Sequence, residues 1–301
     1  MIHPSKRLTT NSEPRTRNPE PVHTRYQNTL ADSAWTSGIA LHTGNRVNCT
    51  LHPAKADTGI VFRRTDLDGG PTVRASLKNV VDTRRATTIA QGDARVHTVE
   101  HLLAALYAFH IDNALIEMDG PEPPVADGSA MPFVELIKQT GTKPLDRPVK
   151  TLKITRPHYV ESGGTKLVAL PADRFIVTCT VKYNCTPLDC QYLSLDITGE
   201  SFERELAAAR TFCPYQEIDQ LIRANLICGG SLDNAVVIKG DTIISKQGLR
   251  FPDEFVRHKI LDLVGDFSLL EQRIAGQIIA VKPGHEANAK LAELLAADQG
   301  D

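Results

Sequence analysis

Two polar residues in the second half of the chain, His258 and Asp262, have the spacing of a metal-binding pair. The apolar periodicity around them predicts a helix from about Asp253 to Asp266. Residues four apart share one helix face, with Cβ atoms roughly 6 Å apart, so both side chains can reach one cation. Imidazole nitrogen and carboxylate oxygen are both zinc ligands. An ordinary solvated pair has the same spacing, so a third ligand is needed to favour a metal site.

A second candidate segment opens the helix predicted over 99–109, where Glu100 precedes His101. Adjacent side chains diverge by about 100° around a helix, so these two cannot both bind one ion. A neutral imidazole can bind zinc while the neighbouring carboxylate takes a proton from the zinc-bound water. His101, His258 and Asp262 would then be three protein ligands with an open fourth position. An open position indicates a catalytic rather than a structural zinc site.

The residues from His97 to His101 also allow a different zinc enzyme. His97, Glu100 and His101 match the H-x-x-E-H pattern of inverted zinc peptidases, in which both histidines bind the metal and the glutamate is the base. The third ligand would then be an acidic residue on another helix, and His258 would have no role. The residues alone leave this peptidase open as an alternative.

The elements that must position these residues alternate between strands and helices. Strands are predicted at 46–51, 60–63, 114–118, 151–154, 166–169, 175–182 and 235–238, and helices at 99–109, 132–140, 201–209, 216–224 and 253–266. Runs of strands followed by helices are typical of the α+β class. At 301 residues, 41% of them hydrophobic, the chain can form one large or two medium domains.

The chain is predicted to divide at the polar, proline-bearing stretch 141–148, which we interpret as a linker. Residues 1–27 are rich in Pro, Ser, Thr, Asn, Arg and Glu, and such a composition predicts a disordered or loosely attached tail. Two α+β domains are expected to follow, a first at 28–145 and a second at 146–301.

Charge and composition exclude several classes of function. The 34 Lys and Arg against 36 Asp and Glu leave a net charge of -2, so no net positive field favours nucleic acid or an anionic membrane. No stretch approaches the roughly 18 consecutive apolar residues that span a bilayer, and the first thirty residues lack the apolar core of a secretory signal. The six cysteines contain no C-x-x-C pair, which favours reduced thiols in a cytoplasmic protein.

Several segments occur in the order typical of one enzyme family. They are GIALHTG (38–44), TGIVFRRTDL (58–67), TVEHLLAAL (98–106), IDNALIEMDGPEPPVADGSAMPF (111–133), ARTF (209–212), GGSLDNAVV (229–237), LRFPDEFVRHKILDLVGD (249–266) and PGHEANAKL (283–291). From about Thr29 to Ala297 the chain thereby closely resembles the UDP-3-O-acyl-N-acetylglucosamine deacetylases of lipid A synthesis. His97 departs from the family, which usually has a small polar residue there.

The resemblance implies a fold and an activity. The fold would be two similarly built α+β domains, each a mainly antiparallel sheet, with the helices packed between the sheets and the site at their junction. The activity would be zinc-dependent hydrolysis of the N-acetyl group of UDP-3-O-(3-hydroxyacyl)-N-acetylglucosamine to acetate and the free amine. We further expect a small-molecule substrate, no nucleic-acid partner, no stable membrane insertion, a monomer, and the cytoplasm of a Gram-negative-type bacterium.

Carried over position by position, the resemblance implies roles for individual residues. The zinc ligands would be His101, His258 and Asp262. The catalytic groups would be Glu100 as base, His285 as general acid, Asp266 orienting that imidazole, and Thr211 supporting the oxyanion. The substrate contacts would be Lys259, Lys282, Phe212 and Asp127. Besides the peptidase, a non-catalytic sugar-nucleotide-binding protein of the same fold is an alternative, which the complete set of catalytic residues argues against.

Overall fold

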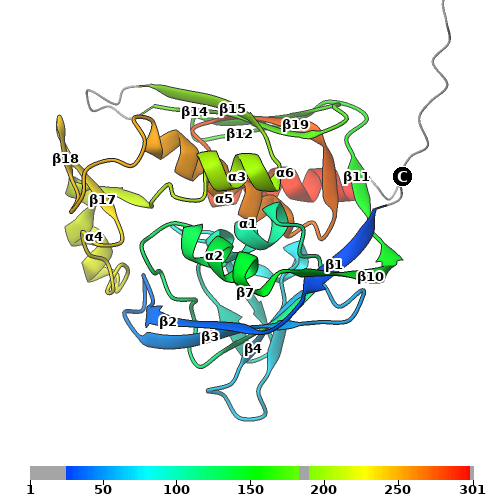
Figure 1. Cartoon of the computed structure of the whole chain (residues 1–301). Helices are drawn as coiled ribbons and strands as arrows, with labels where there is room; N and C mark the ends of the chain where they lie inside the picture. Colours follow the sequence, from blue (N-terminus) through cyan, green and yellow to red (C-terminus); the bar gives the residue numbers. More distant parts are fainter. Residues whose placement is uncertain (1–24, 183–189, 299–301) are drawn as a thin grey trace, which may run out of the picture.

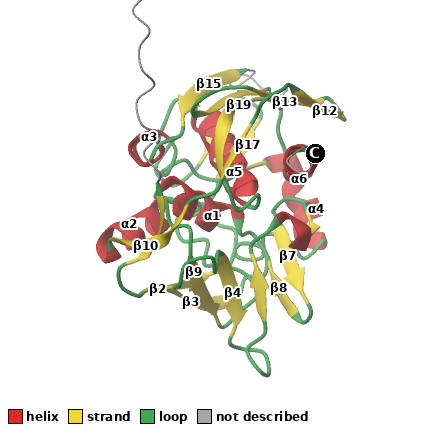
Figure 2. Cartoon of the chain, turned by 90° about the vertical axis from the view of Figure 1, so that its right-hand side faces the viewer, coloured by secondary structure: helices red, strands yellow, loops and turns green. Residues whose placement is uncertain are grey.

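The computed structural model describes residues 25–182 and 190–298, and its fold is α+β, as predicted. Two β-sheets lie on opposite sides of a layer of helices (Figure 1, Figure 2). That layer contains α1 (Glu100–Ala108) and α5 (Glu254–Ser268), with α6 (His285–Ala297) packed against α5. The arrangement confirms the fold class and the helices between the sheets. Within these two described ranges, no helix has the length and apolar character needed to cross a membrane.

The sheet of the first half has the strand order β2-β3-β9-β4-β5. Its strands are β2 (Ala34–Ile39), β3 (Arg46–Pro53), β4 (Ile60–Arg64), β5 (Thr72–Arg74) and β9 (Ala114–Met118). Neighbours are antiparallel except β4 and β9, which run parallel. A small antiparallel sheet of β6 (Val80–Asp82), β7 (Thr88–Gln91) and β8 (Ala94–Val96) precedes α1 and brings the loop before β7 to the start of that helix.

The sheet of the second half has the order β12-β13-β19-β14-β15, and β11 also pairs with β19. The strands are β11 (Thr151–Lys153), β12 (His158–Ser162), β13 (Thr165–Leu170), β14 (Phe175–Val181), β15 (Gln191–Asp196) and β19 (Arg273–Val281). Strand β14 packs against α5 and runs parallel to β19, which ends just before α6. One chain segment thus leads from the centre of this sheet to His285.

Helices α1 and α5 approach each other closely because α5 has a glycine at the crossing point. A Cβ atom at Gly265 would lie 2.1 Å from the backbone oxygen of Glu100, so a larger residue would force the helices apart. Gly265 lies three residues after Asp262, and Glu100 precedes His101. The close approach therefore brings the predicted ligands of the two helices to the same place.

The predicted linker at 141–148 is wrong, because most of it forms strand β10 (Thr142–Pro148), antiparallel to β1 (Tyr26–Leu30). These two strands form a two-stranded ribbon, and β10 pairs with β1 on one side only among the described strands, so it keeps an open edge that tolerates proline. Residues 1–24 of the predicted tail lie outside the described residues, and its last residues, 26 and 27, belong to β1 instead. The domain boundary remains a prediction.

The remaining elements lie around the helical layer. They are α2 (Met131–Thr140), α3 (Gly199–Glu205), α4 (Ile218–Arg223) and a three-stranded sheet of β16 (Phe212–Pro214), β17 (Val236–Lys239) and β18 (Thr242–Ile244). Figure 1 shows β17, β18 and α4 together at one side of the molecule. The first strand of this unit follows directly on Thr211, so the unit borders the candidate site.

Candidate metal site and active site

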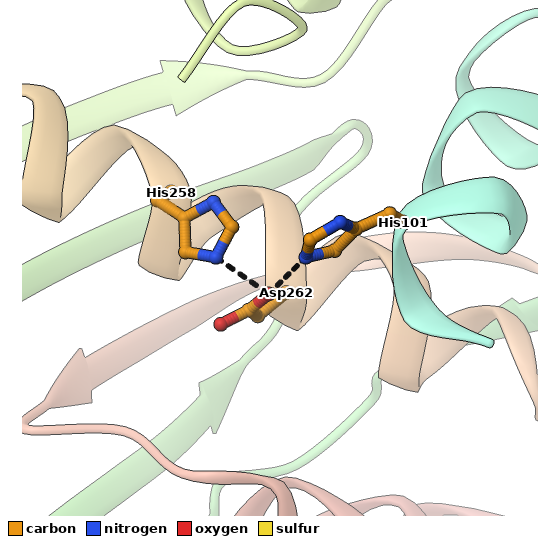
Figure 3. A group of neighbouring side chains, drawn as sticks. All are labelled: His101, His258 and Asp262. Carbon is orange, nitrogen blue, oxygen red and sulfur yellow. Dashed lines mark ion pairs between the residues drawn. The ribbon is translucent and has the colours of Figure 1, made fainter. Parts of the chain in front are cut away.

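Three predicted ligands meet between α1 and α5. His101 comes from α1, and His258 and Asp262 come from successive turns of α5 (Figure 3). One ligand atom from each lies within 4.8 Å of the other two, and each residue is at least 94% buried. Among the described residues, these three are the group of His, Cys, Asp and Glu side chains whose ligand atoms lie close enough together to hold a metal ion.

One carboxylate oxygen of this group lacks a hydrogen-bond partner among residues 25–182 and 190–298. The Oδ1 atom of Asp262 is buried and lies 3.6 Å from His101 Nε2 and 3.5 Å from His258 Nε2, while Oδ2 accepts a hydrogen bond from Lys259 Nζ at 2.8 Å. Burial alone would raise the pKa of Asp262, but Lys259 and the two histidines hold it well below the ordinary value. A buried carboxylate with an unpaired oxygen needs a cation. The donor set therefore fits a metal ion.

The histidine on α5 is oriented for metal binding. Burial lowers the pKa of His258 to about 4, so its ring is neutral near pH 7, as a metal ligand must be. Its Nδ1 lies 3.1 Å from the backbone oxygen of Ala209 and can donate to it, which leaves Nε2 directed toward Asp262. Burial would also lower the pKa of His101, but the neighbouring carboxylates of Asp262 and Glu100 raise it. A bound cation would replace the proton on that ring.

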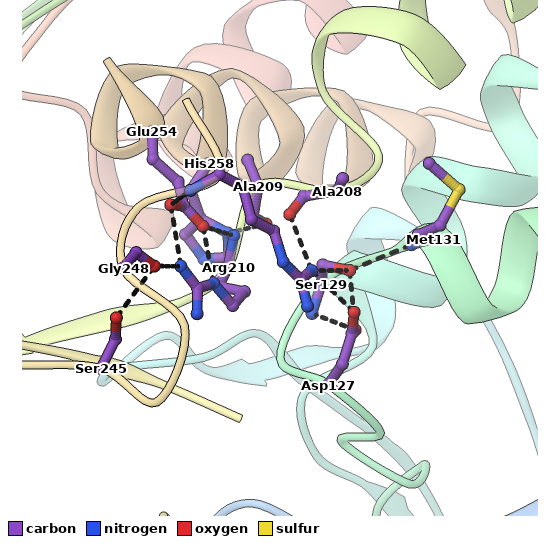
Figure 4. A network of polar contacts seen from close by, with 11 residues as sticks. Asp127, Ser129, Met131, Ala208, Ala209, Arg210, Ser245, Gly248, Glu254 and His258 are labelled. Carbon is purple, nitrogen blue, oxygen red and sulfur yellow. Dashed lines mark hydrogen bonds and ion pairs between the residues drawn. The ribbon is translucent and has the colours of Figure 1, made fainter. Parts of the chain in front are cut away.

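A buried ion pair fixes the segment that supplies the Ala209 oxygen. Arg210 donates from its backbone nitrogen and its Nε to Glu254 Oε1, at 3.0 and 2.8 Å (Figure 4). The two side chains are 2% and 0% exposed. Arg250 adds a backbone hydrogen bond to Glu254 and an ion pair with Asp127 at 2.7 Å. These bonds hold the residues around Ala209 against the start of α5.

The predicted base lies at the first turn of α1, beside the metal-binding group. Glu100 is 3% exposed, and burial raises the pKa of its carboxyl to about 6. Its Oε2 accepts a hydrogen bond from the backbone nitrogen of Thr87 at 3.0 Å. A carboxylate with a pKa this close to neutral pH can take up and release a proton at little cost.

The predicted acid and its orienting residue are in contact. His285, the first residue of α6, has its Nδ1 2.8 Å from Asp266 Oδ2, and Asn288 donates to the same oxygen at 2.7 Å. Burial would lower the pKa of His285, but the charge and hydrogen bond of Asp266, with the charges of Glu100 and Asp262, raise it to about 9. The ring therefore carries a proton at neutral pH that it can give up.

A cavity of about 340 Å³ joins these groups. The predicted residues that line it are Glu100, His101, Thr211, Phe212, His258, Lys259, Asp262 and His285. The ring of Phe212 meets that of His258 edge to face, with centroids 6.0 Å apart. Other lining residues were not predicted from the sequence, including His42, Thr83, Arg85, Ser162 and Thr165. His42, Thr83 and Arg85 lie in loops, and Ser162 and Thr165 flank one hairpin turn, so the fold brings them together from separate segments that no local pattern marks.

Three residues of the sequence analysis lie elsewhere. Lys282 is exposed and Asp127 is paired with Arg250, and neither lines this cavity. His97 precedes α1 and is separated from it by Thr98, whose φ of 52° is not helical. Its Nδ1 lies 3.0 Å from the hydroxyl of Thr88, outside the metal-binding group. The two histidines of the peptidase alternative therefore do not share a helix turn.

Comparison with known proteins gives one family. The family model of UDP-3-O-acyl N-acetylglycosamine deacetylase matches residues 27–297. A UDP-3-O-acyl-N-acetylglucosamine deacetylase of Geobacter sp. (strain M21) is 46% identical over 266 residues, covering 88% of this chain and 87% of the relative. Proteins of that name from Myxococcus xanthus and Chlamydia abortus are 43% and 44% identical, over 90% and 89% of this chain and 87% and 95% of their own lengths.

Proposed function

The chain belongs to the UDP-3-O-acyl N-acetylglycosamine deacetylase family, and we propose that it hydrolyses the N-acetyl amide of UDP-3-O-(3-hydroxyacyl)-N-acetylglucosamine to acetate and the free amine. This reaction is the committed step of lipid A biosynthesis. The observation that carries the proposal is a single cavity that contains a metal-binding triad, a carboxylate with a pKa of about 6 and a protonated imidazole. An amide hydrolase needs these three components.

We propose zinc as the metal, held by His101, His258 and Asp262. Two imidazole nitrogens and one carboxylate oxygen are a usual ligand set of catalytic zinc, and they leave a position open. The unpaired Oδ1 of Asp262 supports this assignment. When bound, zinc supplies polarisation of the amide carbonyl and a lowered pKa for the attacking water.

Glu100 would act as the base. Its carboxylate lines the cavity next to His101, and its raised pKa allows it to accept the proton of the attacking water near neutral pH. The hydrogen bond from the Thr87 backbone fixes one carboxylate oxygen. Thr211 also lines the cavity, and its hydroxyl would donate to the negative charge that develops on the carbonyl oxygen.

His285 would act as the acid. Its Nδ1 is held by Asp266, so the opposite ring nitrogen is the one available to protonate the leaving amine. A raised pKa keeps this proton in place until the carbon–nitrogen bond breaks. Glu100 would then accept the proton of the attacking water, and His285 would donate the proton to the leaving amine.

The substrate-contact roles rest on position. Lys259 and Phe212 line the cavity, where a cation and an aromatic ring can contact the sugar nucleotide. For Lys282 and Asp127, which lie outside this lining, we keep a substrate contact as a proposal that the family resemblance alone supports. The substrate is a small molecule, and we propose that the enzyme acts as a monomer in the cytoplasm.

The decisive experiment measures zinc and chemistry on one preparation. The purified chain should contain about one tightly bound zinc per molecule and should release acetate and free amine in equal amounts from acylated UDP-N-acetylglucosamine. A non-catalytic binding protein would bind this sugar nucleotide without releasing acetate. A peptidase would cleave peptides and leave the acetyl group in place, and either result would contradict the proposal.

A further inference from the structure

A buried threonine from the first half of the chain contacts both the proposed base and the carboxylate that orients the proposed acid. Thr87 lies in the loop between β6 and β7 and is 2% exposed. Its backbone nitrogen donates to Glu100 Oε2 at 3.0 Å, and its hydroxyl donates to Asp266 Oδ1 at 2.6 Å. Glu100 belongs to α1 and Asp266 to α5, so this one residue joins the two helices beside the site.

All three polar groups of Thr87 are used. Besides the two donors, its carbonyl oxygen accepts a hydrogen bond from the backbone nitrogen of Val99 at 3.3 Å. Val99 directly precedes α1, so the backbone of Thr87 is attached to the start of the helix that carries Glu100. A residue held at its backbone in this way presents its hydroxyl in a fixed direction.

The Asp266 carboxylate is held at both of its oxygens. Its Oδ2 accepts from His285 Nδ1 at 2.8 Å and from Asn288 Nδ2 at 2.7 Å, and both donors lie on α6. Among the described residues, Thr87 is the donor to Oδ1. Without the hydroxyl, a buried carboxylate oxygen would lose its partner, and the carboxylate could turn and carry the imidazole with it.

We propose that Thr87 is a positioning residue that fixes the Asp266–His285 pair of the second half against the Glu100 carboxylate of the first half. The inference rests on the proposed function, in which Glu100 and His285 act on the two sides of one amide bond. Proton transfers need the groups in place to within about 0.5 Å, and two groups from different halves of the chain need a direct link to reach this precision.

The test compares three substitutions of buried threonines. Thr87→Val keeps the shape and removes the hydroxyl, and Thr87→Ser keeps the hydroxyl and removes the methyl group. Thr88→Val is the matched control, because the neighbouring Thr88 is 4% exposed and directs its hydroxyl to His97. We expect kcat to fall about 10-fold in Thr87→Val, with KM and zinc content within about twofold of wild type. Thr87→Ser and Thr88→Val should stay within about threefold in kcat.

A double-mutant cycle separates positioning from general destabilisation. If Thr87 acts through the acid, Thr87→Val should change kcat by less than about twofold when His285→Ala is already present. An equal loss in both backgrounds, an equal loss in Thr88→Val, or loss of zinc from Thr87→Val would overturn the proposal.

A measurement without substrate keeps the inference separate from the proposed function. In nuclear magnetic resonance of the zinc-loaded protein, the Nδ1 proton of His285 should exchange with water at least about 10-fold faster in Thr87→Val than in wild type or Thr87→Ser. Unchanged exchange overturns the positioning role even if the enzyme is active. If wild type releases no acetate, the proposed function fails, while faster exchange in Thr87→Val still supports the link to His285.

Discussion

Two buried charged clusters on α5 differ in how completely their atoms are paired. At the start of the helix, the Glu254 carboxylate accepts hydrogen bonds from the backbone and side chain of Arg210 and from the backbone of Arg250. About two turns later, Asp262 Oδ1 is equally buried but has no hydrogen-bond partner among the described residues. The Glu254 carboxylate is thus satisfied by groups of the protein itself, whereas Lys259 bonds only Oδ2 of Asp262 and leaves Oδ1 available to a bound ion.

The difference separates a structural role from a functional one. A buried carboxylate is tolerated when its hydrogen bonds and charge are satisfied within the protein. Glu254 meets this condition, and its bonds keep the Ala209 oxygen in place for His258. Asp262 meets it only in part, through Lys259. Burial alone therefore does not identify the metal site, but burial with an unpaired oxygen does.

The largest expected effect is the loss of the metal from the incomplete cluster. His258→Ala removes one of three protein ligands, and zinc content after dialysis should fall from about one per chain to near zero, with activity reduced by about 1000-fold or more. His97→Ala is the matched control and should retain the metal. Zinc retained in His258→Ala but lost in His97→Ala would restore the peptidase alternative.

The second prediction concerns stability, and the expected loss differs between the two clusters. Glu254→Gln leaves the Arg210 guanidinium, 2% exposed, without its counter-charge and should lower the free energy of unfolding by about 3–5 kcal/mol, with or without zinc. Asp262→Asn should cost less in metal-free protein, because the side chain of Lys259 is 20% exposed and can reach water.

Added zinc is the control for this pair of variants. It should raise the melting temperature of wild type and Glu254→Gln, since both keep the three ligands, and leave Asp262→Asn unchanged. Equal responses of the two variants to zinc would show that the distinction between the clusters is wrong.

The third prediction tests whether Glu100 belongs to the metal-binding group. As a base rather than a ligand, Glu100→Ala should reduce deacetylation by at least about 100-fold while zinc content stays near wild type. Glu100→Gln should behave similarly, because the amide keeps the size of the side chain but cannot take up the proton. Metal loss in either variant would make Glu100 a ligand.

Local spacing made the incomplete cluster predictable from sequence. His258 and Asp262 are one helical turn apart, and Glu100 and His101 are adjacent, so helical geometry alone relates the members of each pair. The complete cluster was not predictable, because Arg210 and Glu254 are 44 residues apart and each reads as an ordinary charged residue. Thr87 was missed for the same reason, since it is 179 residues from Asp266 and lies in no recognisable pattern.

The prediction of secondary structure from the sequence was wrong where the local pattern is weak. Strand β10 contains Pro144 and Pro148, which predict a linker, and only its pairing with β1 makes it a strand. Helix α6 was not predicted, because its buried face contains only two large apolar residues, Leu291 and Leu295, beside His285, Asn288 and two alanines. That helix carries His285, so its acid role was implied by the family resemblance and not by spacing.

The smallest expected effect is the pH dependence of activity. It distinguishes Glu100 and His285, which gain or lose a proton during the reaction, from Glu254, which does not take part in it. The base must be deprotonated, so activity should fall about 10-fold per pH unit below about pH 6, where the Glu100 and metal-water assembly takes up a proton. The acid must be protonated, so activity should fall again above about pH 9, where His285 loses its proton. His285→Gln should have a lower maximum and no alkaline limb, whereas Glu254→Gln, assayed where it is folded, should keep both limbs. An alkaline limb that survives in His285→Gln would show that another group donates the proton, even if the metal site is correct.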